Sequence, residues 1–228
     1  MTTVTIKIDL RSIFGPIRDQ GQRPTCLAFA ASDAHAALRG AWVPLSCEYV
    51  FFRAQERANR RPTEGVTLPS ILDVLRYDGQ PKELGWPYLT EMPADLSRWQ
   101  PPSGIAPRFR RASETKHDTV DEIIEELEQA RPVVVLMRLS TSFDWAGRAG
   151  VVDPDAGEMP DPFRRHAVVA VGHGELNGQR AVLIRNSWGD GWGDGGYAWL
   201  TERFLVPRIF GLAILTEDLS VSPHTAAA

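Results

Sequence analysis

The spacing of hydrophobic residues divides the chain into a helical first part and a second part rich in strands. In the first part, apolar residues at helical spacing and an alanine-rich stretch predict helices; these cover residues 25–38, 47–59 and 69–77. In the second part, one amphipathic helix is expected over residues 119–130. Short apolar runs predict strands at residues 133–139, from 151, 166–172, 181–186, 196–200 and 212–215, and an alternating run predicts another at 4–8.

This order of elements predicts an α+β fold in one domain over residues 1–228, because helices followed by strands pack as segregated layers. A proline-rich irregular segment, residues 86–104, lies between the two parts. We expect lobe L to cover about residues 10–105 and lobe R about residues 106–218, with a cleft between them, a favoured place for a site. The small polar residues 219–228 predict a disordered tail.

The composition excludes several classes of function. With 43% hydrophobic and 24% charged residues, the 228-residue chain is typical of soluble globular proteins. Its net charge of −4 gives no reason to expect nucleic acid or an anionic membrane as a partner, and no apolar run has the length of a membrane span. The start of the chain lacks a signal-peptide profile and there are only two cysteines, so we expect a reducing, cytoplasmic location. Delivery into another cell as an effector stays open.

One stretch, residues 186–193 (NSWGDGWG), has two tryptophans and three glycines around one asparagine. Each glycine loses much backbone freedom on ordering, so the stretch is expected to hold something in place. Asn186 is positioned to orient His166 through a hydrogen bond to its amide oxygen. Trp188 is positioned to cover that hydrogen bond and to exclude water from it. Cys26 lies where a loop becomes a helix, and N–H groups there stabilise a thiolate. Taken alone, each residue also has a purely structural explanation: Cys26 as a small buried apolar residue and His166 as a hydrogen-bonded core histidine.

Several blocks, in this order, make the chain similar to the papain family of cysteine peptidases. The resemblance spans residues 10–215, and the separation of Cys26 from His166 falls within the roughly 130–150 positions found in that family. The blocks are PIRDQGQ with Cys26 and AFA, then Leu45-Ser46, Trp86-Pro87-Tyr88, residues 132–135 (PVVV), 150–152 (GVV), 166–168 (HAV), and residues 186–193 with Gly196-Tyr197. The resemblance implies a two-lobed fold, with a helical N-terminal lobe and an antiparallel, β-barrel-like C-terminal lobe.

The resemblance also implies a role for each matching residue. Cys26 would be the nucleophile, His166 the general base and acid, and Asn186 the residue that orients His166. Gln20, with the Cys26 backbone N–H, would hold the oxyanion. The substrate-binding residues would be Gly65, Ala167, Leu27 and Trp188. No cofactor or metal is implied, and the substrate would be a protein or peptide.

The chain departs from the family in its cysteines and beside its histidine. Arg23 stands where relatives usually have a disulfide cysteine, which suggests either a cytosolic location or stability from packing alone. Leu27 replaces a tryptophan, which puts specificity at that end of the cleft in doubt. Arg165 stands where relatives often have Asp or Asn; it would depress the pKa of His166, bind an acidic substrate group, or remain a solvated side chain.

The leading hypothesis is a papain-like cysteine endopeptidase that acts through a Cys26 thioester. Because no inhibitory leader precedes the resemblance, we expect control from elsewhere, such as a separate inhibitor or immunity protein. One alternative is a thiol acyltransferase on the same fold, such as a peptide ligase or a transglutaminase-like enzyme, in which an amine intercepts the thioester. Another is a catalytically silent binding module that keeps the cleft.

Overall fold

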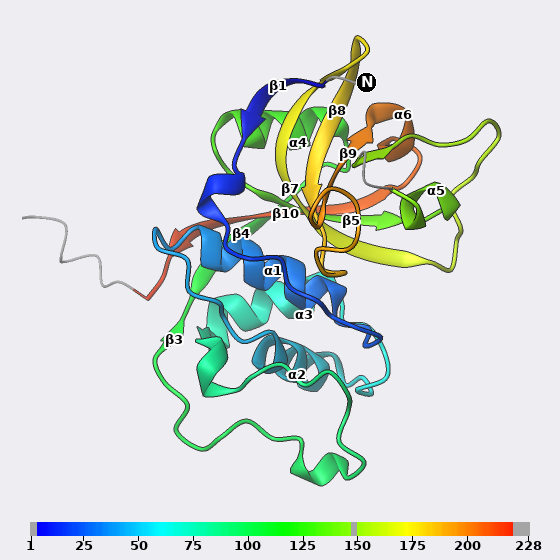
Figure 1. The fold of residues 1–228 in the computed structure, drawn as a ribbon. Helices are drawn as coiled ribbons and strands as arrows, with labels where there is room; N and C mark the ends of the chain where they lie inside the picture. Colours follow the sequence, from blue (N-terminus) through cyan, green and yellow to red (C-terminus); the bar gives the residue numbers. More distant parts are fainter. Residues whose placement is uncertain (1–3, 147–149, 221–228) are drawn as a thin grey trace, which may run out of the picture.

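The computed structural model describes residues 4–146 and 150–220 and has a helical lobe below a lobe built on a sheet (Figure 1). The helices are α1 (Cys26–Ala37), α2 (Cys47–Ala58), α3 (Leu68–Asp73), α4 (Val120–Glu128), α5 (Thr141–Asp144) and α6 (Glu202–Leu205). The strands are β1 (Val4–Asp9), β2 (Gln80–Pro81), β3 (Arg108–Phe109), β4 (Arg111–Lys116), β5 (Val133–Arg138), β6 (Val151–Val152), β7 (Arg165–Leu176), β8 (Gln179–Arg185), β9 (Tyr197–Thr201) and β10 (Ile209–Asp218).

The main sheet has eight strands, seven of them in the order β4-β10-β5-β7-β8-β9-β6. Its pairs are antiparallel except β6 with β9, and β1 adds to the second half of β7. The α+β class predicted from the sequence is confirmed. Within residues 4–146 and 150–220, however, the strand pairing is an open path from β4 to β6 and does not close into a barrel, so the expected barrel-like form is corrected to an open sheet.

Two hydrophobic cores lie on opposite faces of this sheet. Strand β5 contributes to both: Val134 packs in the core shared with α1, α2 and α3, whereas Val133 and Val135 pack in the core shared with α4 and α6. Successive residues of a strand point to opposite faces, so a strand covered on both sides is apolar throughout. The strand predicted from residue 133 is therefore present and is buried on both faces.

Helix α1 is the central element and positions the site. From Leu27 to Ala37 all its residues are buried, as expected for a helix covered on every side. It packs against β5 and β7 of the sheet and against α2 and α3 of its own lobe (Figure 1). Cys26 is its first residue and lies where the helix meets the sheet lobe.

The predicted helices and strands are present, with differences at their ends. The side chain of Ser46 accepts a hydrogen bond from the Tyr49 N–H and so caps α2 as expected. The third helix becomes a π-helical turn over Val74–Asp78 before Gly79 ends it. β7 and β10 extend beyond their predicted ends, and the sequence pattern did not predict β4.

The division into lobes stays a prediction, which the segregation of α1–α3 from the sheet supports. Within the predicted tail, Leu219 and Ser220 form hydrogen bonds with the backbone of Arg110. Residues 221–228 lie outside the described part of the chain. No helix in residues 4–146 and 150–220 is long and apolar enough to cross a lipid bilayer.

Candidate active site

A cleft of about 850 Å³ contains residues from both lobes. Seven of the eight residues predicted to form the site line it: Gln20, Cys26, Leu27, Gly65, His166, Ala167 and Trp188. The eighth, Asn186, is buried and contacts His166 instead. The structure therefore brings together in space residues that the sequence spreads over most of the chain.

Cys26 lies at the start of α1, where nearby backbone N–H groups act to lower the pKa of its thiol. These groups belong to Ala167, next to His166, and to Leu27 and Cys26 at the start of the helix. Burial nevertheless outweighs these donors and raises the pKa of the Cys26 thiol. The N–H groups expected at the helix start are therefore present and favour the thiolate, whereas burial of the sulfur opposes it.

The side chain of Asn186 determines which nitrogen of His166 carries the proton. Asn186 Oδ1 accepts a hydrogen bond from the Ser187 backbone N–H at 2.8 Å, which fixes the orientation of the amide. The same oxygen lies 2.7 Å from His166 Nε2, so this nitrogen must be the donor. His166 Nδ1 is then unprotonated and is a base. Burial lowers the pKa of His166 to about 4, so the imidazole is neutral at physiological pH.

Aromatic rings surround His166. The Trp188 ring centroid lies 4.7 Å from that of His166, and Phe143 of α5 approaches His166 at 5.7 Å. Trp192 packs on Phe143 at 4.9 Å, and its Nε1 donates to the Phe143 carbonyl. The cluster covers the imidazole as predicted for Trp188, and in a water-poor setting the bond to Asn186 is stronger.

The side-chain amide of Gln20 is held by hydrogen bonds at both its oxygen and its nitrogen. Its Oε1 accepts from the Ser187 hydroxyl at 2.7 Å, and its Nε2 donates to the Arg23 carbonyl at 2.9 Å. This orientation leaves the second Nε2 hydrogen for another acceptor at the cleft. Ser187 thus connects Gln20 to Asn186, its neighbour in sequence, a link that the sequence interpretation missed.

The loop of residues 186–193 needs glycine at one turn. Gly193 has a φ of +61°, and a Cβ there would lie 2.3 Å from the Tyr197 carbonyl oxygen. No other residue fits without moving the backbone. The turn returns the chain to β9 directly after the indole of Trp192 has packed on Phe143.

The predicted substrate-binding residues lie on both walls of the cleft. Leu27 and Ala167 are buried beneath its surface, whereas Gly65 and Trp188 are partly exposed. Arg165 also lines the cleft and is exposed, but the arginine whose charge lowers the pKa of His166 is Arg164. The expected influence of Arg165 on that pKa therefore belongs to its neighbour.

Arg23, at the position of the missing disulfide cysteine, forms a buried ion pair. Its guanidinium donates to both carboxylate oxygens of Glu48, at 2.6 and 2.9 Å. Glu48 also accepts from the Leu89 N–H and from Trp99 Nε1. Packing alone therefore does not replace the disulfide: a buried ion pair lies there, although Arg23 Nε has no hydrogen-bond partner among the described residues.

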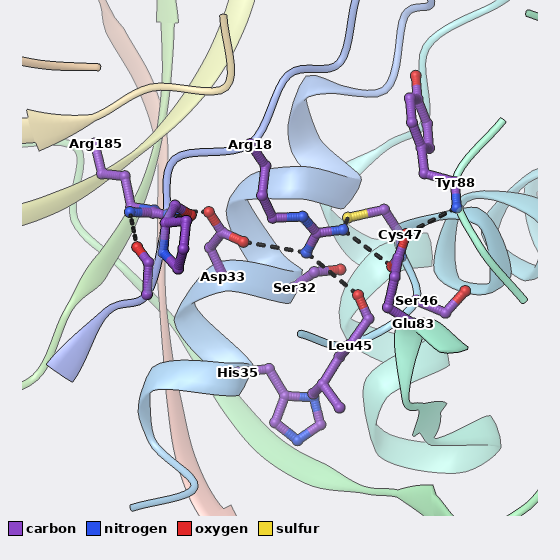
Figure 2. A network of polar contacts seen from close by, with 12 residues as sticks. Arg18, Ser32, Asp33, His35, Leu45, Ser46, Cys47, Glu83, Tyr88 and Arg185 are labelled. Atoms are coloured by element: carbon purple, nitrogen blue, oxygen red, sulfur yellow. Dashed lines mark hydrogen bonds and ion pairs between the residues drawn. The ribbon is translucent and has the colours of Figure 1, made fainter. Parts of the chain in front are cut away.

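A second buried polar network joins the segments that carry the candidate residues (Figure 2). Asp33 of α1 contacts Arg185 through one oxygen at 2.7 Å and Arg18 through the other at 3.2 Å. Arg185 precedes Asn186, Arg18 lies two residues before Gln20, and Asp33 shares α1 with Cys26. Arg18 also contacts the Cys47 sulfur and Glu83. Sequence reasoning missed this network because nothing local predicts that Asp33 and Arg185 meet.

The described residues offer no metal-binding cluster of three or more His, Cys, Asp or Glu side chains. What this arrangement can perform with protein groups alone is acyl transfer. The site has the thiol of Cys26, the imidazole base of His166 oriented by the Asn186 amide, and the hydrogen-bond donor of Gln20 at the same cleft.

Comparison with known proteins agrees with this geometry. The family model described as papain family cysteine protease matches residues 4–204. Peptidase 1 of Dermatophagoides farinae is 28% identical over 205 residues, which cover 86% of this chain and 60% of that protein. Cathepsin K of Gallus gallus is 30% identical over 194 residues, which cover 82% of this chain and 55% of that protein. The chain thus spans less than two thirds of the length of either relative.

Solved structures show the same fold. Xylellain, a cysteine protease from Xylella fastidiosa, matches with a TM-score of 0.73 at 19% identity over 94% of this chain and 87% of that one. A cysteine protease of Carica candamarcensis, solved in complex with E-64, matches with a TM-score of 0.73 at 21% identity, over 92% and 97% of the two chains. The papain-like α+β fold inferred from the sequence blocks is therefore confirmed.

Proposed function

This chain belongs to the papain family of cysteine proteases, and we propose that it is an endopeptidase that hydrolyses peptide bonds through a thioester on Cys26. The observation that carries the proposal is the tautomer of His166. Its Nε2 donates a hydrogen bond to Asn186, so its basic Nδ1 is free to accept a proton from the thiol of Cys26, which lines the same cleft.

The first half of the proposed reaction forms the thioester. As the Cys26 sulfur attacks the peptide carbonyl, its proton moves to His166 Nδ1. The carbonyl oxygen becomes an oxyanion and accepts hydrogen bonds from Gln20 Nε2 and the Cys26 N–H. The C–N bond then breaks, His166 returns the proton to the departing amine, and the acyl group stays on sulfur.

The second half releases the acid. His166 Nδ1 takes a proton from water, whose oxygen attacks the thioester carbonyl, and the same donors hold the new oxyanion. The C–S bond breaks, the proton returns to sulfur, and the free thiol and a carboxylic acid result. An amine in place of water would give the acyltransferase alternative, so the two activities differ only in the acceptor.

The substrate in this proposal is a protein or peptide, and an inhibitor would occupy the same cleft. The Carica relative was solved with E-64, which supports small inhibitors as ligands of this fold. We further propose that a separate inhibitor or immunity protein covers the cleft. A reducing, cytoplasmic location is also proposed, because Cys26 and Cys47 are both free thiols.

The test is to incubate the protein with a peptide and to identify the products by mass spectrometry. Wild type should release a carboxylic acid from an internal bond, Cys26→Ala should release none, and Cys47→Ala should retain activity. Repeating the reaction with added glycinamide identifies an acyltransferase by the mass of the amide product. Folded wild type that cleaves nothing and forms no amide would contradict the proposal and favour a binding module.

A further inference from the structure

Two arginines lie directly opposite each other where the sheet reaches the cleft. Arg138 of β5 and Arg165 of β7 are register partners, beside the pair formed by Met137 and His166. No carboxylate within residues 4–146 and 150–220 forms an ion pair with either guanidinium, whereas the adjacent Arg164 is paired with Asp144. Like charges directly opposite on neighbouring strands destabilise a sheet. This pair is therefore unexplained by folding.

Both guanidiniums lie against the ring of Phe210. Their Cζ atoms are 5.6 Å (Arg138) and 5.7 Å (Arg165) from its centroid, within the range of a cation–π contact. The pairing of β10 with β5 shifts between Ile209 and Gly211, so Phe210 is the extra residue of a β-bulge. Bulges redirect side chains and are frequent beside active sites. Phe210 and Arg165 line the cleft, and the ring orients both cations.

The cleft carries positive charge without acidic compensation. Its four charged lining residues are all arginines: Arg23, Arg60, Arg164 and Arg165. No Asp or Glu among the described residues lines it, although acidic residues outnumber basic ones, 29 to 25, in the whole chain. Arg23 and Arg164 are paired with carboxylates, so the charge available to a ligand includes that of Arg165, with Arg138 beside it.

We propose that Arg138 and Arg165, held by Phe210, bind a carboxylate side chain of the substrate close to the scissile bond. A carboxylate between the two guanidiniums would cancel their repulsion and accept hydrogen bonds from their N–H groups. Arg165 precedes His166, so the bound side chain lies near the reacting carbonyl. The inference rests on the proposed peptidase activity and adds its substrate class: peptides with Asp or Glu near the cleaved bond.

The experiment compares matched peptides that differ only in Asp against Asn, or Glu against Gln, at each position flanking the cleaved bond. At one flanking position, wild type should show a kcat/KM at least about tenfold higher for the acid, as expected for hydrogen bonds to a charged group. The ratio should fall towards one in Arg138→Gln/Arg165→Gln, and Arg165→Glu should favour Lys over Asp at that position. Because the arginines repel each other, the double variant should fold, which thermal unfolding checks.

Arg76→Gln is the matched control. Arg76 is an exposed arginine over the Tyr77 ring and does not line the cleft, so the ratio should stay at the wild-type value. Equal cleavage of acid and amide peptides by wild type, or an acid preference that persists in the double variant, would overturn the inference while leaving peptidase activity standing. Failure of folded wild type to cleave any peptide would instead overturn the proposed function and this inference with it.

Discussion

The amide of Asn186 is the single group on which the chemistry of His166 depends. Both bonds to its oxygen are short, and its orientation is set by a backbone N–H and not by the histidine itself. Replacing this residue leaves the ring free to rotate and to carry its proton on the wrong nitrogen. The reaction would then lack a base facing Cys26.

Asn186→Ala is accordingly expected to lower kcat by roughly a hundredfold or more, with a smaller effect on KM, because a wrong tautomer impairs the chemical step. Steady-state kinetics on one peptide checks this, and nitrogen NMR of the imidazole would report the change of tautomer. Unchanged kcat with an intact fold would show that Asn186 does not orient His166.

The pH dependence of kcat/KM also belongs to His166. Its pKa is lowered to about 4 by burial, so the base is neutral and competent above that pH and is lost as pH falls through it. The acid limb of kcat/KM should therefore have a midpoint near 4, well below the usual histidine value. An acid limb near 6.5 would contradict the burial of this ring.

At the scale of elements, Asp33 holds three segments together: α1, the loop before Gln20, and the end of β8 (Figure 2). Its carboxylate is buried, and both partners carry positive charge. Removing it leaves two guanidiniums in the interior with no carboxylate between them, which is costlier than losing a surface pair.

Asp33→Ala should reduce the free energy of unfolding by about 3–5 kcal/mol, as breaking a buried ion pair does. The control is Glu175→Ala, which breaks the exposed pair with Lys7 and should cost about 1 kcal/mol or less. Urea unfolding measures both. Similar small losses in the two variants would show that the Asp33 network does not fasten the lobes.

The same scale shows what could be predicted from the sequence. Ranges with strong periodicity, such as α4 and β5, were predicted to within a few residues. Strand β4 (RASETK) was missed because four of its six residues are polar and at least partly exposed. No alternation of apolar and polar residues therefore marks it as a strand. Strand pairing with β10 decides its conformation instead.

The site was predicted better than its surroundings. Cys26, His166, Asn186 and Gln20 stand in blocks whose order and spacing resemble a known family, and the structure places all four together. The Arg23–Glu48 pair and the Arg138–Arg165 pair depend on which elements become neighbours. Neither contact leaves a local signal, because a buried and an exposed arginine look alike in sequence.

At the scale of the whole molecule, stability should depend on two buried neutral histidines. Burial lowers the pKa of both His35 and His166 to about 4. The unfolded chain binds their protons below about pH 6.5 while the folded chain does so only near 4, so stability falls as pH drops through this window. Each histidine contributes about 3 kcal/mol to that loss.

His35→Leu separates this effect from that of other groups. The variant loses the contact with Gln80 at every pH, but the fall in unfolding free energy between pH 6.5 and 4 should be smaller than in wild type by about 3 kcal/mol. Urea unfolding at a series of pH values measures the slope. Parallel curves for the two proteins would contradict a neutral buried His35.

The whole molecule also explains why the candidate nucleophile and base come from different lobes. Cys26 begins α1 of the helical lobe, and His166 is the second residue of β7, a strand of the sheet that this helix packs against. The two side chains meet only when α1 is docked on the sheet. We therefore expect activity to be lost together with the native fold and not before it.

The most direct test of the central claim is covalent labelling by E-64 followed by peptide mapping. We predict one adduct per molecule, on Cys26, with Cys47 unmodified because it is fully buried, and no adduct in Cys26→Ala. Folded protein that stays unlabelled at Cys26, or that is labelled at Cys47 instead, would contradict the assignment of Cys26 as the nucleophile.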